Sequence, residues 1–203
     1  MINDMMDELV AYISDSGREG EVATSKGEYF RDAGGLFGDE DTYPMRIGAF
    51  LEWFVLDKQT GGKTLIEEYL GKMEDEERRA AFSPLEHSIR SIFEVRRVDA
   101  DGLHLRDMKD GKKYRALSTG VLEMFKKGCI VEARLFPEGD RYHLSTSCIF
   151  HPEKVKKFIL AEMKEAAISD DMGPLINRLS AMSLKRERYS NYDLARIYKK
   201  KEN

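Results

Sequence analysis

Long apolar runs are absent from this sequence of 203 residues, which holds no uninterrupted stretch of about 18 apolar residues. We therefore expect no transmembrane helix and no contact with a membrane. The first ten residues, MINDMMDELV, carry three acidic and no basic side chains, so the basic and apolar regions of a signal peptide are also missing. Only 2 Cys are present, and without an export signal both thiols are expected to stay reduced in the cytoplasm.

The net charge of −4 is the sum of an acidic N-terminal part and a basic C-terminal part. Residues 1–82 contain 19 Asp and Glu against 9 Lys and Arg, a balance of −10, whereas residues 83–203 contain 18 against 24, a balance of +6. This asymmetry predicts modules with different surfaces. We divide the chain into an acidic helical module (1–82), a small β domain (83–151) and a basic helical segment (152–203).

The first module has the period of amphipathic helices. Ile2, Met5, Leu9 and Ile13 recur at three- and four-residue steps, which places them on one helix face. Further helices are predicted over residues 18–32, after Asp39-Glu40-Asp41 with an apolar side from Ile47 to Val55, and from Leu65 to about Met73. Thr64 with Glu67 predicts a capping box at the start of the last of these helices. SPLE, residues 83–86, predicts another helix that begins at Pro84 and continues to about Arg90.

The period then changes from helical to two. Five segments are rich in β-forming residues and are separated by turn residues: FEVRRV (93–98), LHLRDM (103–108), KKYRAL (112–117), GCIVEARLF (128–136) and RYHLSTSCIF (141–150). They predict a five-stranded small antiparallel barrel, either SH3-like or OB-like. Helical periodicity returns after Pro152 and is interrupted at Gly173-Pro174. The expected fold class is therefore α+β.

The segment VLDKQTGGKTLIE (55–67) resembles a nucleotide-binding P-loop only at its end, Gly62-Lys63-Thr64. Asp57 occupies the position of the first glycine, and its carboxylate would repel a phosphate. The preceding residues have the pattern of a helix rather than of a central strand. We interpret the segment as a connection between two helices, in which a glycine ends one helix and Thr64 begins the next.

The two cysteines and nearby histidines raise the question of a metal site. A four-residue loop at Pro137–Asp140 would pair Cys129 with Cys148, and His143 would lie on the opposite face of the sheet. The thiols are then neighbours that act as small buried hydrophobes, with a disulfide or a zinc site as alternatives. The sequence identifies no catalytic residue, no metal ligand and no cofactor site.

The C-terminal segment is basic and rich in tyrosine. A candidate nucleic-acid surface consists of Lys185, Arg186, Arg188, Tyr189, Tyr192, Arg196 and Tyr198, in which cations would contact phosphates and rings would stack on bases. The alternative is a helix that packs its tyrosines against the protein and leaves its cations in solvent.

The order of the motifs RIGAFLEWFVLD, GKTLIEEYL, SPLEHSIRSIFEV, LHLRDMKDGKKY, GCIVEARLF and CIFHPEKV resembles that of a group of uncharacterised bacterial proteins. In these proteins a helical module precedes a small β domain, and related β domains are found near zinc-binding SEC-C motifs. The present chain has no Cys-rich SEC-C segment. The resemblance covers about residues 46–155 and implies no activity and no catalytic residue.

These observations together predict a cytoplasmic, non-enzymatic binding or adaptor protein that contacts a protein partner or a second copy of itself. Nucleic-acid binding, to RNA or single-stranded DNA, is the alternative. An enzyme whose site is assembled from distant loops is the third hypothesis, since such a site is invisible in one sequence.

Overall fold

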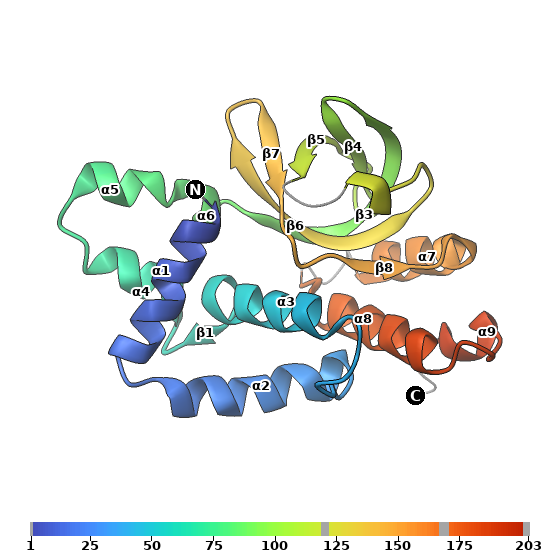
Figure 1. Ribbon diagram of the computed structural model, residues 1–203, viewed down its shortest axis with the longest axis horizontal. Helices are drawn as coiled ribbons and strands as arrows, with labels where there is room; N and C mark the ends of the chain where they lie inside the picture. The colour runs from blue at the N-terminus through green and yellow to red at the C-terminus, as the bar shows by residue number, and fades with distance from the viewer. Residues whose placement is uncertain (1, 119–121, 167–170, 201–203) are drawn as a thin grey trace.

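The computed structural model describes residues 2–118, 122–166 and 171–200. A β-barrel lies above a layer of helices, with α3 and α8 directly beneath it and α2 below them (Figure 1). The α-helices are α1 (Ile2–Asp15), α2 (Glu19–Ala33), α3 (Tyr43–Leu56), α4 (Leu65–Gly71), α5 (Glu76–Ala81), α6 (Ser83–Glu86), α7 (Lys156–Ala166), α8 (Gly173–Arg188) and α9 (Leu194–Ile197). Two 3₁₀ turns, η1 (Leu122–Met124) and η2 (Glu153–Val155), precede β6 and α7.

The strands are β1 (Gln59–Thr60), β2 (Lys63–Thr64), β3 (Ile89–Asp99), β4 (Gly102–Asp107), β5 (Lys113–Ser118), β6 (Ile130–Glu138), β7 (Arg141–Leu144) and β8 (Ile149–His151). Helices thus come before and after a β domain, and the predicted α+β class is confirmed.

Helix α1 buries Met5, Leu9 and Ile13, the face that its periodicity predicts. At the start of α4, the Thr64 hydroxyl accepts from the Glu67 amide while the Glu67 carboxylate accepts from the Thr64 amide, so the predicted capping box is confirmed. The helix predicted from Pro84 to Arg90 is wrong beyond Glu86, because β3 begins at Ile89. Pairing of Ile89 and Arg90 with β6 overrides the local helix signal there.

The segment that resembles a P-loop folds as a β-hairpin. Strands β1 and β2 pair antiparallel around Gly61 and Gly62, whose φ angles of 62° and 84° are those of a tight hairpin turn. The connection predicted between two helices therefore contains a short sheet. Asp57 accepts a hydrogen bond from Arg134 of the barrel, so its carboxylate serves to join the helical module to the barrel.

Five strands close the barrel in the order β3-β4-β5-β7-β6, with β6 returning to β3. Strands β5 and β7 are parallel, so the predicted fully antiparallel barrel is wrong in this pair. The reason is that β6 pairs with β3 rather than forming a hairpin with β5. Strand β7 then follows β6 in a hairpin and lies between β6 and β5, parallel to β5. This strand order, with its third and fifth strands parallel, is that of an OB-fold rather than an SH3-like barrel.

The predicted register of the last hairpin is also wrong. Glu138 pairs with Arg141 around a two-residue turn, and the strand predicted over 141–150 is broken into β7 and β8. Glu132 pairs with Ile149, so Cys148 lies beside the middle of β6, whereas Cys129 precedes its first residue. Cys129 and Cys148 are not cross-strand partners, and both thiols are free.

The helical layer joins the barrel through a buried charge cluster, which we define as Glu52, Asp57, Arg90, Glu132 and Arg134. Arg90 and Arg134 are direct cross-strand neighbours on β3 and β6. Arg90 donates to Glu132 at 2.9 Å and to the Asn177 side chain of α8 at 2.9 Å, while Arg134 donates to Asp57. Helix α8 packs against α2, so the N-terminal and C-terminal helices share one layer below the barrel (Figure 1).

Candidate functional site

A cleft of about 450 Å³ lies where the loop before α3, the end of α8, η1 and β8 meet. Its floor is apolar and its rim is acidic. The floor is lined by Met45, Met124, Cys148, Ile149 and Phe150, and the rim by Asp39, Glu40, Asp41 and Glu187. The basic side chains at the cleft are Arg46 and Arg188. We define these residues, together with the adjacent Phe37, as the acidic cleft.

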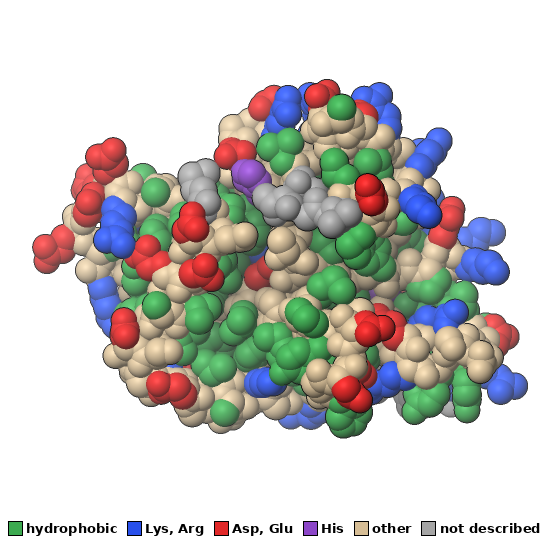
Figure 2. All heavy atoms as spheres, viewed as in Figure 1, with side chains coloured by type: hydrophobic (Ala, Val, Ile, Leu, Met, Phe, Trp, Pro, Cys, Tyr) green, Lys and Arg blue, Asp and Glu red, His purple; other side chains and the backbone are tan. Residues whose placement is uncertain are grey.

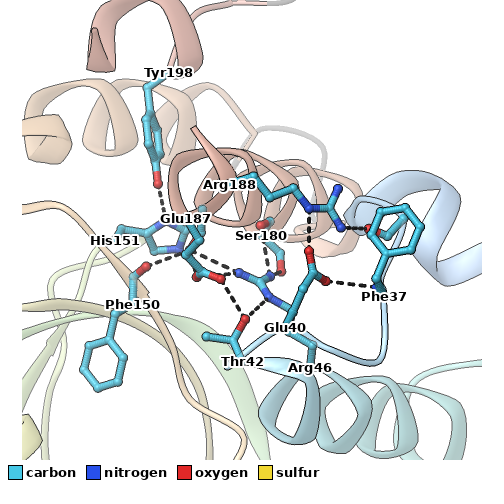
Figure 3. Close-up of polar contacts among 12 residues, drawn as sticks. Phe37, Glu40, Thr42, Arg46, Phe150, His151, Ser180, Glu187, Arg188 and Tyr198 are labelled. Atoms are coloured by element: carbon cyan, nitrogen blue, oxygen red, sulfur yellow. Dashed lines mark hydrogen bonds and ion pairs between the residues drawn. The ribbon is translucent and has the colours of Figure 1, made fainter. Parts of the chain in front are cut away.

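Arg46 ties the wall of the cleft together. Its side chain, 2% exposed, donates from Nε to Thr42 at 3.0 Å and from its terminal nitrogens to Ser180, Ser183 and Glu187 (Figure 3). The shortest of these bonds is 2.8 Å, to Glu187. All five guanidinium N–H groups are engaged. Arg46 therefore fixes α3 to α8, and it has no donor left for a ligand.

Arg188, Glu40 and Phe37 form the outer edge of the cleft. Arg188 donates to Glu40 and to the carbonyl of Gly35, and its guanidinium lies 4.9 Å from the centre of the Phe37 ring (Figure 3). Burial alone would raise the pKa of Glu40, but hydrogen bonds from Arg188 and from the Phe37 amide hold it below the ordinary value. Glu40 is therefore ionised and neutralised by Arg188.

His151 and Tyr198 lie behind the cleft. The His151 Nδ1 and the Tyr198 hydroxyl are joined by a 3.0 Å hydrogen bond, and both side chains are buried (Figure 3). Burial, with the nearby charge of Arg46, lowers the pKa of His151 to about 3. The imidazole is neutral at physiological pH, and its buried Nε2 has no hydrogen-bond partner among the described residues.

Two exposed apolar side chains, Met124 and Phe37, lie at this cleft or its edge. Among the described residues, five large hydrophobic side chains are exposed, and four of them are Phe37 (63%), Met124 (51%), Tyr189 (48%) and Tyr192 (54%). Met124 lines the cleft, and Phe37 packs on Arg188, the residue next to Tyr189. The Tyr189 and Tyr192 rings contact each other in a tilted arrangement, with centroids 5.4 Å apart. Met124 and Phe37 therefore add exposed apolar surface to the cleft and its edge, while Tyr189 and Tyr192 form a separate aromatic pair after α8.

The thiol in the cleft floor, Cys148, lacks the environment of an activated nucleophile. Burial raises the pKa of the Cys148 thiol to about 12, so the thiolate needed for attack is not present at neutral pH. Among the described residues, no group of three or more His, Cys, Asp or Glu lies close enough to hold a metal ion. None of the described helices is long and apolar enough to cross a bilayer.

The structure separates the predicted nucleic-acid residues into four groups. Tyr198 is buried against His151, and Arg188 is engaged by Glu40. Tyr189 and Tyr192 are exposed and contact each other. Lys185 and Arg196 line a different groove on the other side of α8, while Arg186 is half-buried and lines neither cavity.

Sequence reasoning missed Arg46, Phe37 and Met124. Arg46 had one detectable signal, because it lies four residues before Phe50 and hence on the buried face of α3. A basic residue on an apolar face has to find buried partners. The partners come from α8, more than 130 residues away, and no local pattern identifies them.

No curated protein matches the chain, and no solved structure matches it. Residues 36–172 match the model of a family described as a family of unknown function (DUF7986). The matched segment extends beyond the predicted 46–155 at both ends and contains α3, the whole barrel and α7. Since it covers more than half of the 203 residues, the chain belongs to this family of unknown function.

Proposed function

We propose that the protein binds another protein through the acidic cleft and acts as an adaptor rather than as a catalyst. One observation carries the proposal: the cleft has an apolar floor that includes the exposed Met124, and the exposed Phe37 packs on Arg188 at its edge. A contiguous exposed apolar patch with a polar rim is typical of a protein interaction site. Aromatic side chains, such as Phe37 here, contribute much of the binding energy in many such interfaces.

The charges of the rim specify the partner. Glu40 and Glu187 are neutralised by Arg188 and Arg46. Asp39 and Asp41 have no ion-pair partner within the part of the chain that the structure describes. The rim therefore keeps a negative charge around an apolar floor. A segment with Lys or Arg beside an aromatic or aliphatic anchor complements both features. The predicted bacterial and cytoplasmic setting is part of the same proposal.

A phage-displayed peptide library tests this function directly. We expect selection on the wild-type protein to enrich peptides that combine basic and apolar residues. A synthetic peptide of the enriched sequence should bind Phe37→Ser/Met124→Ser at least about 30-fold more weakly, because loss of an interface anchor costs about 2 kcal/mol or more. Val10→Ser is the matched control, since Val10 is the fifth exposed apolar side chain and lies on α1.

Equal weakening by Val10→Ser, or failure to enrich any peptide, would contradict the proposal. Light scattering examines the case in which the partner is a second copy of the chain. A particle of twice the monomer mass that Phe37→Ser dissociates supports the cleft as the interface. A dimer that survives this substitution does not.

A further inference from the structure

A second cavity, independent of the acidic cleft, lies among α2, α7, α8 and α9. It is an open groove of about 1060 Å³. Six basic side chains line it: Arg31, Arg178, Lys185, Arg196, Lys199 and Lys200. The acidic residues that line it are Asp32 and Asp171. We define this cavity as the basic groove, and α9, which contributes Arg196 and Ile197 to it, lies at the lower right in Figure 1.

The charge of the groove contrasts with the net −4 of the chain. Arg178 is bound by Glu162, and Lys200 lies 2.6 Å from Glu165, so part of the positive charge is compensated from α7. Lys185 and Arg196 have no ion-pair partner among the described residues. Figure 2 shows the same separation on a larger scale, with acidic side chains gathered at the end formed by α1, α4 and α5 and basic ones along the opposite edge.

The floor of the groove is apolar, with Pro174, Leu175, Ala181, Met182 and Ile197 between the cations. A free phosphate would use the charges and leave this floor empty. A linear polyanion that also carries flat apolar groups uses both features. A single-stranded nucleic acid has this chemistry, because its phosphates follow a basic channel while its unpaired bases contact apolar or guanidinium surfaces.

We propose that the basic groove binds single-stranded nucleic acid. Lys185 and Arg196 contact phosphates, and the bases lie against the floor at Leu175 and Met182. A duplex buries its bases in the helix axis and cannot present them to this floor. A flat membrane surface cannot reach the base of a groove. The inference does not depend on the proposed protein partner, since the two cavities share no lining residue.

The experiment is fluorescence anisotropy with labelled single strands of about 20 nucleotides, oligo(U) and oligo(dT), titrated at several KCl concentrations. We expect the affinity to fall as salt rises, by a slope of about 0.7 per phosphate contact. Lys185→Ala/Arg196→Ala removes two such contacts. Its slope should therefore be smaller by about 1.4, and its affinity at 0.1 M salt should be lower by about 25-fold.

Lys63→Ala/Arg79→Ala is the matched control, because it removes two exposed cations from β2 and α5, outside the groove. It should leave both the slope and the affinity unchanged. Neither Lys185 nor Arg196 has an ion-pair partner among the described residues, so we expect the groove variant to melt at the wild-type temperature.

Three results would overturn the inference. The first is no binding of either strand at 50 mM salt. The second is an equal loss of affinity in the groove and control variants. The third is tighter binding to polyglutamate, to phosphatidylserine vesicles or to duplex DNA than to the single strands, each measured with the same wild-type protein.

Discussion

The buried charge cluster makes a quantitative prediction for Arg134→Met. The Arg134 side chain is 3% exposed, donates to Asp57 and to the Ser88 hydroxyl at 3.0 Å, and has its Nε 3.6 Å from Glu52. Methionine fills much of the same volume but leaves Glu52 and Asp57 without this cation. Removing one partner of a buried ion pair costs about 3–5 kcal/mol. The Glu52 side chain is 13% exposed and bears this cost, whereas Asp57 is 32% exposed and keeps Arg90 at 4.0 Å. We therefore expect Arg134→Met to lose about 3 kcal/mol of unfolding free energy at pH 8, the lower end of this range.

The pH dependence identifies the cause. Burial raises the pKa of Glu52, and the charge of Arg134 opposes this effect. Without Arg134 the pKa of Glu52 rises further. A carboxyl whose pKa is higher in the folded state binds more protons there than in the unfolded state, so stability falls as pH rises through this window. The cost of Arg134→Met should therefore be smaller at pH 5 than at pH 8, where Glu52 has to ionise.

Chemical denaturation at both pH values measures these quantities. Glu52→Gln in the Arg134→Met background should recover part of the loss at pH 8, since it removes the unpaired charge. Arg79→Met is the control, because Arg79 is exposed on α5, and it should change stability by less than about 0.5 kcal/mol. A loss below about 1 kcal/mol for Arg134→Met, or the same loss at pH 5 and pH 8, would refute the reasoning.

Two further predictions concern a glycine and a histidine. A Cβ on Gly102, where φ is 119°, would lie 2.4 Å from the Ala116 carbonyl oxygen, whereas one on Gly139, where φ is 58°, meets no atom within 4 Å. Gly102→Ala should therefore cost more than about 2 kcal/mol in urea denaturation and Gly139→Ala about 1 kcal/mol, and equal costs would contradict this. His151 has its pKa lowered to about 3, so the unfolded chain binds a proton from about pH 6.5 downward that the folded chain does not. Melting temperatures should fall from pH 7 to pH 4 in the wild type and less steeply in His151→Gln, and parallel curves would be the negative result.

The elements that could be predicted from the sequence have local causes. The apolar face of α1 and the capping box at Thr64 depend on residues a few positions apart. Five strands can be predicted because each has a period of two in its sequence. Their order around the barrel cannot be predicted in this way. Strand β6 pairs with β3, about 40 residues away, and the parallel contact of β5 with β7 follows from that crossing. The register of β6 with β7 failed because the turn uses two residues rather than four.

The candidate sites were less predictable because they are held by polar residues that lack a period in the sequence. Asn177, Ser180 and Ser183 are buried on α8, where hydrophobic periodicity alone would place apolar side chains. Each has a distant partner: Arg90 for Asn177, Arg46 for Ser180, and the Phe150 carbonyl for Ser183. The candidate nucleic-acid residues of the C-terminal segment were predicted from charge and ring type alone. These properties do not distinguish Arg188, which is bound to Glu40, from Arg196, which lines the basic groove.

Helix α8 connects the two proposed activities. Its end supplies Glu187 and Arg188 to the acidic cleft, and Arg178 and Lys185 line the basic groove. Helix α8 also binds Arg46 of α3, which lines the acidic cleft, through Ser180, Ser183 and Glu187. The helix follows the segment that matches the family, residues 36–172. The barrel and α3 therefore lie within the family segment, while both proposed binding surfaces are completed by a helix outside it. Substitutions along α8 should consequently change binding properties on a scaffold whose strand order stays the same.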